Sequence, residues 1–148
     1  MYRGGSEAEA LALGLRQSDV LMEEARQRIL DAATARKIQE MGVSTVVIKR
    51  GEYGALYFEK DHIFFCPAYP LEDVVDPTGA GDTFAGGVMG SLASAGQVSE
   101  RELRRAMIHG SVLASFNVED FSLNRMQQIT RSDIDARYRE FLRFTAHP

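Results

Sequence analysis

The stretch Val74–Gly90 constrains the fold more than any other part of this sequence. It contains the run Asp-Pro-Thr-Gly-Ala-Gly-Asp and continues with mainly small residues of helical character. The strand-like segment Leu71–Val75 leads into this run, so we predict a strand-to-helix junction at Thr78–Asp82. So many small residues let neighbouring backbone approach closely, which favours a buried helix that closes at Gly96.

The glycines of this junction predict an anion site. The first N–H groups of a helix have no intrahelical acceptor, and the helix dipole adds partial positive charge there. The N–H groups of Gly79, Ala80 and Gly81 would suit a phosphate or a developing negative charge. Asp82 either complements the helix dipole or takes a proton from a hydroxyl that attacks phosphorus. The spacing matches neither of the two commonest nucleotide fingerprints.

The elements around the junction predict an α/β domain. A helix capped by Asp19 ends at Met41-Gly42, and the run 43–48 that follows is apolar enough for a buried, parallel strand. A hairpin turns at Lys60-Asp61. The other expected elements are a short helix Ser6–Leu13, strands 55–59 and 62–66, a helix opened by the capping box Ser99–Glu102, and a last helix from near Ser132.

Composition excludes several classes of protein. The chain of 148 residues is 45% hydrophobic, enough for one domain, 1–148, in which Met1–Gly5 has the look of a fusion scar. Its net charge of −4 disfavours nucleic-acid and membrane partners. A single cysteine, Cys66, and the absence of a signal peptide or membrane span indicate a cytoplasmic protein. We expect Cys66 to be a small core residue.

The stretch Asp76–Phe84 closely resembles the second signature of the ribokinase-like (PfkB) family of carbohydrate and nucleoside kinases. Val46–Ala55 is similar to the family's strand and glycine turn, and Arg104–Phe116 to its adenine-side helix. The resemblance covers nearly the whole chain, from about Ala25 to Phe144. It implies the C-terminal, nucleotide-binding half of a Rossmann-like, three-layer α/β fold with a β-hairpin and C-terminal helices.

The resemblance implies a role for each residue of the junction. Asp82 would be the catalytic base that acts on a sugar or nucleoside hydroxymethyl group. Gly79, Ala80 and Gly81 would form the anion hole. Carbonyl groups near Asp76 and Thr78 would hold a monovalent cation, typically potassium.

The resemblance also implies ATP, with Mg²⁺, as the cofactor. Lys49, Gly51 and Gly54 would lie near its phosphates or ribose, and the segment His109–Asn117 would border the adenine. Solvated charge is an equal alternative for Lys49. Simple helix packing is the safer interpretation of His109. For the phenylalanines, core packing is favoured over stacking on a ligand: Phe116, Phe121, Phe141 and Phe144.

The chain departs from the family in one large respect. Nothing corresponds to the family's N-terminal half, which carries most of the sugar-binding residues. Glu7 or Glu9 would belong to the family's Asn-x-x-Glu motif, but the first asparagine is Asn117. A core built for a larger partner predicts self-association or a missing N-terminal half.

These observations leave several functions open. The first is an ATP-dependent sugar kinase of the PfkB type, present as a fragment that is inactive alone. The alternatives are a fragment of a nucleoside (adenosine-like) kinase, a non-catalytic nucleotide- or anion-binding module, and a subunit completed by a separate N-terminal chain.

Overall fold

The computed structural model describes residue 27 and residues 30–145, which fall into two units, residues 1–46 and residues 47–148. In the first unit, residues 30–40 are helical. Gly42, with a φ of 101°, ends this helix as predicted, and its N–H donates to the Gln39 carbonyl at 3.0 Å. The Asp19 cap, the helix Ser6–Leu13, Glu7, Glu9 and the segment Met1–Gly5 lie outside the described residues.

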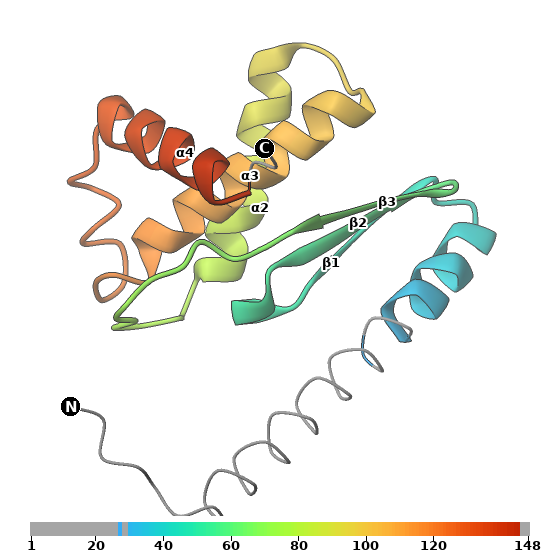
Figure 1. The fold of residues 1–148 in the computed structure, drawn as a ribbon, viewed down its shortest axis with the longest axis horizontal. Helices are drawn as coiled ribbons and strands as arrows, with labels where there is room; N and C mark the ends of the chain where they lie inside the picture. Colours follow the sequence, from blue (N-terminus) through green and yellow to red (C-terminus); the bar gives the residue numbers. More distant parts are fainter. Residues whose placement is uncertain (1–26, 28–29, 146–148) are drawn as a thin grey trace, which may run out of the picture. The chain divides into compact units, whose positions relative to one another are not determined.

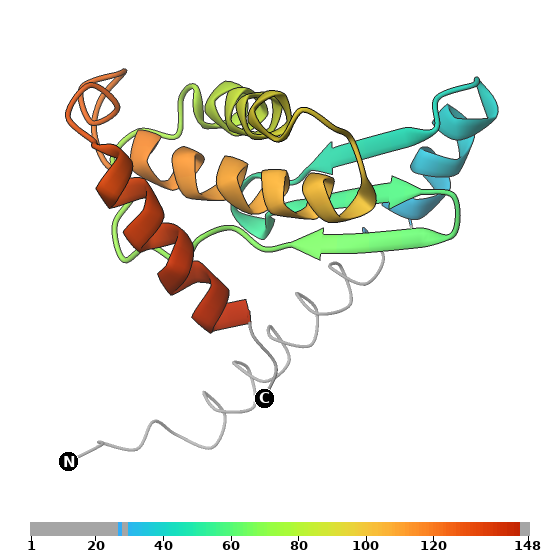
Figure 2. The same ribbon diagram turned by 90° about the horizontal axis from the view of Figure 1, so that it is seen from above.

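The described strands form one sheet in the order β1-β2-β3. The predicted hairpin is confirmed: β2 (Ala55–Glu59) pairs antiparallel with β3 (His62–Cys66). Glu59 faces His62, which leaves a two-residue loop in which Lys60 adopts a φ of 50°. Figure 2 shows the strands running in alternating directions.

The prediction of a buried, parallel strand over 43–48 is wrong in two respects. The strand β1 (Thr45–Lys49) returns into β2 through the short 3-10 turn η1 (Gly51–Tyr53), so the two strands are antiparallel. Within the described residues β1 is an edge strand. Val46 is buried, but the side chain of Val47, which points to the opposite face of the strand, is exposed.

Three helices follow the sheet: α2 (Ala80–Ala95), α3 (Glu100–Asn117) and α4 (Arg131–Thr145). Figure 1 shows them gathered on one side of the sheet. Both predicted caps are confirmed. The N–H of Glu102 donates to Ser99 Oγ at 3.3 Å, and Gly96, with a φ of 66°, closes α2 by donating to the Leu92 and Ala93 carbonyls. No helix within the described ranges is long and apolar enough to cross a membrane.

Two other local predictions are wrong. The segment Leu71–Val75 is not a strand, since the N–H of Val75 donates to the Val118 carbonyl at the end of α3, 2.8 Å away, and not to a strand ladder. Helix α2 is buried along one face only. Gly87 and Val88 are buried against α3, whereas the side chain of Met89 is exposed.

The core lies where α3 packs against the hairpin and α4. Phe116 and Phe141 are buried in it, and so is Cys66, as predicted. Phe121, in the loop between α3 and α4, and Phe144, in the last turn of α4, are exposed, contrary to expectation. This core fixes the start of α2 relative to the end of α3, which is where the candidate site lies.

Candidate functional site

The start of α2 presents open backbone N–H groups. Gly79 is the N-cap residue and adopts a left-handed φ of 82°, a conformation that glycine enters without steric cost. The N–H of Ala80 donates to the Pro77 carbonyl at 3.2 Å, and that of Thr83 to the Gly79 carbonyl at 2.9 Å. Among the described residues, no acceptor takes the N–H of Gly79, Gly81 or Asp82. We call these three groups the amide trio; they are donors for an anion.

The loop that precedes α2 is held by its own aspartate. Asp76 Oδ1 accepts the N–H of Thr78 at 2.9 Å, which forms an Asx turn. Hydrogen bonds from Thr78 to the carboxylate, first from its backbone and then from its side chain, hold the pKa of Asp76 below its usual range. Asp76 is therefore an ionised structural residue of the loop, and only its carbonyl could serve a cation.

The buried side chain of Asn117 ties the same loop to the end of α3. Its Nδ2 donates to the Thr78 carbonyl at 3.1 Å, and its Oδ1 accepts the Thr83 hydroxyl at 2.5 Å. Asn117 is 1% exposed. One amide side chain thus fixes both sides of Gly79, whose backbone turns between Thr78 and α2.

Thr83→Val should lower the free energy of unfolding by about 1–3 kcal/mol, because it leaves the buried Oδ1 of Asn117 without its donor. Valine keeps the shape of threonine, so lost packing does not account for the change. Thr83→Ser retains the hydroxyl and serves as the matched control. Urea unfolding of the three proteins checks this; equal stability of the valine and serine variants would contradict the role given to Asn117.

Asp82 and Lys49 lie beside the amide trio. Asp82 is in the first turn of α2, and its side chain is exposed. Lys49 ends β1, and its Nζ donates to the Gly81 carbonyl at 3.0 Å. A cation and a carboxylate therefore flank the open N–H groups, an arrangement that could hold an anionic group and accept a proton beside it.

A cavity of about 660 Å³ opens next to the trio. It is mostly apolar, and we call it the apolar cavity. Its lining includes three of the predicted site residues from the sheet side and two from α2, listed with their main neighbours: Lys49, Gly51, Gly54, Ala80, Gly81, Pro67, Ala68, Tyr69, Phe84, Ser111, Ala114 and Val118. The volume is in the range of small-molecule sites.

Gly54 has a structural reason to be glycine. It adopts a φ of 87°, and a Cβ atom there would lie 2.2 Å from the Cys66 carbonyl oxygen. This close approach brings the β1–β2 turn against the end of β3 and closes one wall of the apolar cavity. Gly51 also adopts a positive φ, 56°, with open space around it.

The two predicted site residues named on the adenine side, His109 and Asn117, do not line the apolar cavity. His109 faces a different groove, between α2, α3 and α4, where its ring stacks on Tyr138 at 4.2 Å. Asn117 points into the loop before α2 and does not line the cavity. Adenine contacts for these two residues stay predictions. Helix packing accounts for what His109 contacts in the structure.

Ser111 and Ser115 line the apolar cavity from α3, within the segment His109–Asn117 that was expected to border the adenine, although sequence reasoning did not single them out. Ser111 Oγ donates to the Pro67 carbonyl at 3.0 Å, and Ser115 Oγ to the Val112 carbonyl at 2.7 Å. Their spacing of four on the buried face of a helix was the available signal. Cys66, also in the lining, is buried, which raises the pKa of its thiol to about 12 and keeps it unreactive.

No group of three or more His, Cys, Asp or Glu side chains that could hold a metal ion exists in the described part of the chain. The Thr78 carbonyl, a predicted ligand of a monovalent cation, already accepts the Asn117 amide at 3.1 Å. A carbonyl oxygen has a second lone pair, so this hydrogen bond leaves room for one further partner.

Comparison with known proteins places this geometry in a family. The model of the pfkB family carbohydrate kinases matches residues 6–129. A 5-dehydro-2-deoxygluconokinase of Photobacterium profundum is 35% identical over 88 residues, which is 60% of this chain and 25% of that protein. A cytidine kinase of Thermococcus kodakarensis is 41% identical over 75 residues, 49% of this chain and 26% of that protein.

The same fold occurs in solved structures. An aminoimidazole riboside kinase from Salmonella enterica, complexed with aminoimidazole riboside and an ATP analog, is 28% identical with a TM-score of 0.60. That match covers 68% of this chain and 33% of the other. The chain thus spans about a quarter to a third of the relatives it matches. With a family model that matches most of its residues, the chain belongs to the pfkB family of carbohydrate kinases.

Proposed function

We propose that the complete protein transfers a phosphoryl group from ATP to a hydroxyl group of a sugar or nucleoside, and that this chain supplies the nucleotide side of the site. The observation that carries the proposal is the amide trio of Gly79, Gly81 and Asp82, open to an anion beside an exposed carboxylate. The match to the pfkB family, whose relatives include sugar and nucleoside kinases, supports it.

The residues of the apolar cavity fit a nucleotide. Its apolar walls suit a purine ring, and the amide trio with Lys49 lies at its edge, where phosphates would be held. Gly51 and Gly54 keep the backbone of the β1–β2 turn close to the cavity without side chains in the way. ATP, with Mg²⁺ on its phosphates, would supply the phosphoryl group and neutralise part of its charge.

Side chains and backbone groups of this chain would carry out the other steps of the transfer. Asp82 takes the proton of the acceptor hydroxyl as its oxygen forms the new bond to phosphorus and the bond to the leaving phosphate oxygen breaks. The N–H groups of Gly79, Gly81 and Asp82 donate to the phosphate oxygens that gain charge in the transition state. Asn117 keeps these donors aligned through Thr78 and Thr83. A monovalent cation at the Thr78 carbonyl would add positive charge to the same loop.

The acceptor class is a sugar or a nucleoside, and the residues that bind it lie outside this chain's apolar cavity. Relatives that act on either substrate class match this chain, so the match does not select between the two classes. A partner half of the site, from the same polypeptide or from another chain, would bind the acceptor. The cytoplasmic location indicated by the sequence stays a prediction.

Transfer of labelled γ-phosphate from ATP tests the proposal. The complete protein is incubated with Mg²⁺ and a panel of sugars and nucleosides, and labelled products are separated. We expect one substrate class to accept the label. ATP binding without transfer to any member of the panel would favour the non-catalytic nucleotide-binding module instead.

A further inference from the structure

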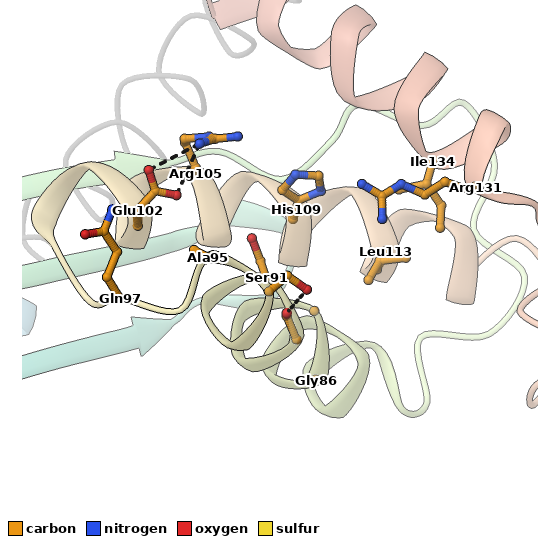
Figure 3. A pocket seen from close by; sticks show the side chains of 13 residues that line it. Gly86, Ser91, Ala95, Gln97, Glu102, Arg105, His109, Leu113, Arg131 and Ile134 are labelled. Atoms are coloured by element: carbon orange, nitrogen blue, oxygen red, sulfur yellow. Dashed lines mark hydrogen bonds and ion pairs between the residues drawn. The ribbon is translucent and has the colours of Figure 1, made fainter.

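A second groove lies on the other side of α3 from the apolar cavity and shares none of its lining residues. We call it the basic groove; its volume is about 540 Å³. It runs between α2, α3 and α4. The side chains that matter for binding are Ser91 from α2, Arg105 and His109 from α3, and Arg131 from α4. In Figure 3 His109 lies between the two arginines along the groove.

Both arginines keep donors for a ligand. Arg131 contacts Asp135 through Nε at 3.0 Å, and its two terminal nitrogens make no hydrogen bond to any described residue. Arg105 uses Nη1 for both oxygens of Glu102, each at a long 3.2 Å, and its guanidinium also contacts the Tyr138 side chain; its five N–H groups exceed these partners. Figure 3 shows the Arg131 guanidinium on the side of the groove that faces His109.

The charges that reach the centre of the groove are mainly positive. Burial, and then the charges of Arg131 and Arg105, lower the pKa of His109 below its usual value, while Asp135 raises it. From α4, Tyr138 covers one face of the ring. Helix α2 brings no charged side chain to the lining, only glycines, serines and alanine. Each arginine has a carboxylate partner, Glu102 or Asp135, but at His109 the charge of Asp135 offsets the two arginines only in part.

We propose that the basic groove binds the phosphate group of a small phosphorylated molecule, with Arg105 and Arg131 as its main ligands. Donors come from three helices, which suits the oxygens of a tetrahedral group better than a planar carboxylate. The volume exceeds that of the phosphate group and leaves room for the molecule that carries it. This site is separate from the amide trio and does not depend on the kinase activity.

The imidazole of His109 reports on occupancy without an enzyme assay. A bound dianion favours the protonated ring, so phosphate should raise the pKa of His109 by roughly half a pH unit in an NMR titration of the full chain. Sodium chloride at equal ionic strength is the blank, and His62 is the internal reference. A His109→Asn variant assigns the signal.

Arg131→Gln distinguishes specific binding of phosphate in the basic groove from a general attraction of anions to positive charge on the protein. In chloride it should raise the pKa of His109, because a neighbouring positive charge is lost. It should also weaken the response to phosphate about tenfold or more, the loss expected for one charge-assisted hydrogen bond. Arg143→Gln, the same change at an exposed position of α4, should alter neither the pKa of His109 in chloride nor its response to phosphate.

The proposal is overturned if phosphate leaves His109 unchanged, if His62 responds equally, or if Arg131→Gln and Arg143→Gln behave alike. Inorganic phosphate and glycerol 3-phosphate distinguish free phosphate from a phosphate ester as the ligand. Succinate, a dicarboxylate, tests whether the groove selects a phosphate group over a carboxylate. A response to succinate as strong as that to phosphate would refute the choice of a phosphate group.

Discussion

Asp82→Asn is expected to lower kcat of the complete protein by about 10²- to 10⁴-fold while the KM for ATP stays nearly constant. Asparagine keeps the size of aspartate but cannot accept the hydroxyl proton. The open N–H groups of Gly79 and Gly81 are unchanged by the substitution, so phosphate binding should persist. Steady-state kinetics with the acceptor identified by the transfer assay measures both constants.

Asp73→Asn is the matched control for this prediction. Asp73 is an exposed aspartate of the segment before α2 and lines neither groove. The same loss of charge there should leave kcat within about twofold, because long-range charge effects at exposed positions are weak at physiological salt. Equal activities of the two variants would remove Asp82 from the chemical step.

Gly110→Ala should lower the free energy of unfolding by about 1–3 kcal/mol, and more if the helices must move apart. A Cβ atom at Gly110 would lie 2.7 Å from the Phe84 carbonyl oxygen and 2.9 Å from Val88 Cγ2. The first of these is backbone of α2 and cannot turn away. The contact is reciprocal, since a Cβ atom at Gly87 would lie 2.9 Å from the Gly110 Cα.

Gly90→Ala provides the control on the neighbouring helix. A Cβ atom at Gly90 meets nothing within 4 Å, so alanine should stabilise α2 by about 0.5–1 kcal/mol through its higher helix propensity. Urea unfolding of the 148-residue chain compares the two variants. If both glycines accept alanine equally, α2 and α3 do not approach as closely as the structure has them.

Local signals in the sequence predicted the elements that local interactions determine. The capping box at Ser99, the closing glycine Gly96 and the two-residue hairpin loop were each predicted where the structure has them. In each case a few adjacent residues satisfy the backbone by themselves, so the pattern is sufficient.

Predictions that depended on distant partners were less successful. The run 43–48 was apolar enough for a central parallel strand, but burial of a strand depends on its neighbours, and β1 has β2 alone among the described residues. The segment Leu71–Val75 bonds to the end of α3, a partner more than forty positions away in sequence. Periodicity carries no information about such partners.

In the candidate site, too, features set by adjacent residues could be predicted, and features that join distant residues could not. The position of the donors at the helix start could be predicted from the spacing, and the N–H groups of Gly79 and Gly81 are open as expected. The N–H of Ala80, also predicted as a donor for the anion, is instead bonded to the Pro77 carbonyl, and the open N–H of Asp82 was not predicted. The hydrogen bonds of Asn117 to Thr78 and Thr83 could not be predicted, since they join α3 to a loop 39 residues earlier and to the helix α2 34 residues earlier. The basic groove needs three helices to form and has no signal in sequence order.

The backbone amide signals of α2 test the central claim most directly. NMR spectra of the complete protein would be recorded with and without a non-hydrolysable ATP analogue and Mg²⁺. We predict downfield shifts of the amide protons of Gly79, Gly81 and Asp82, with a smaller change at Ala80, whose N–H already donates to Pro77. An analogue that binds yet leaves these three protons unmoved would contradict the account.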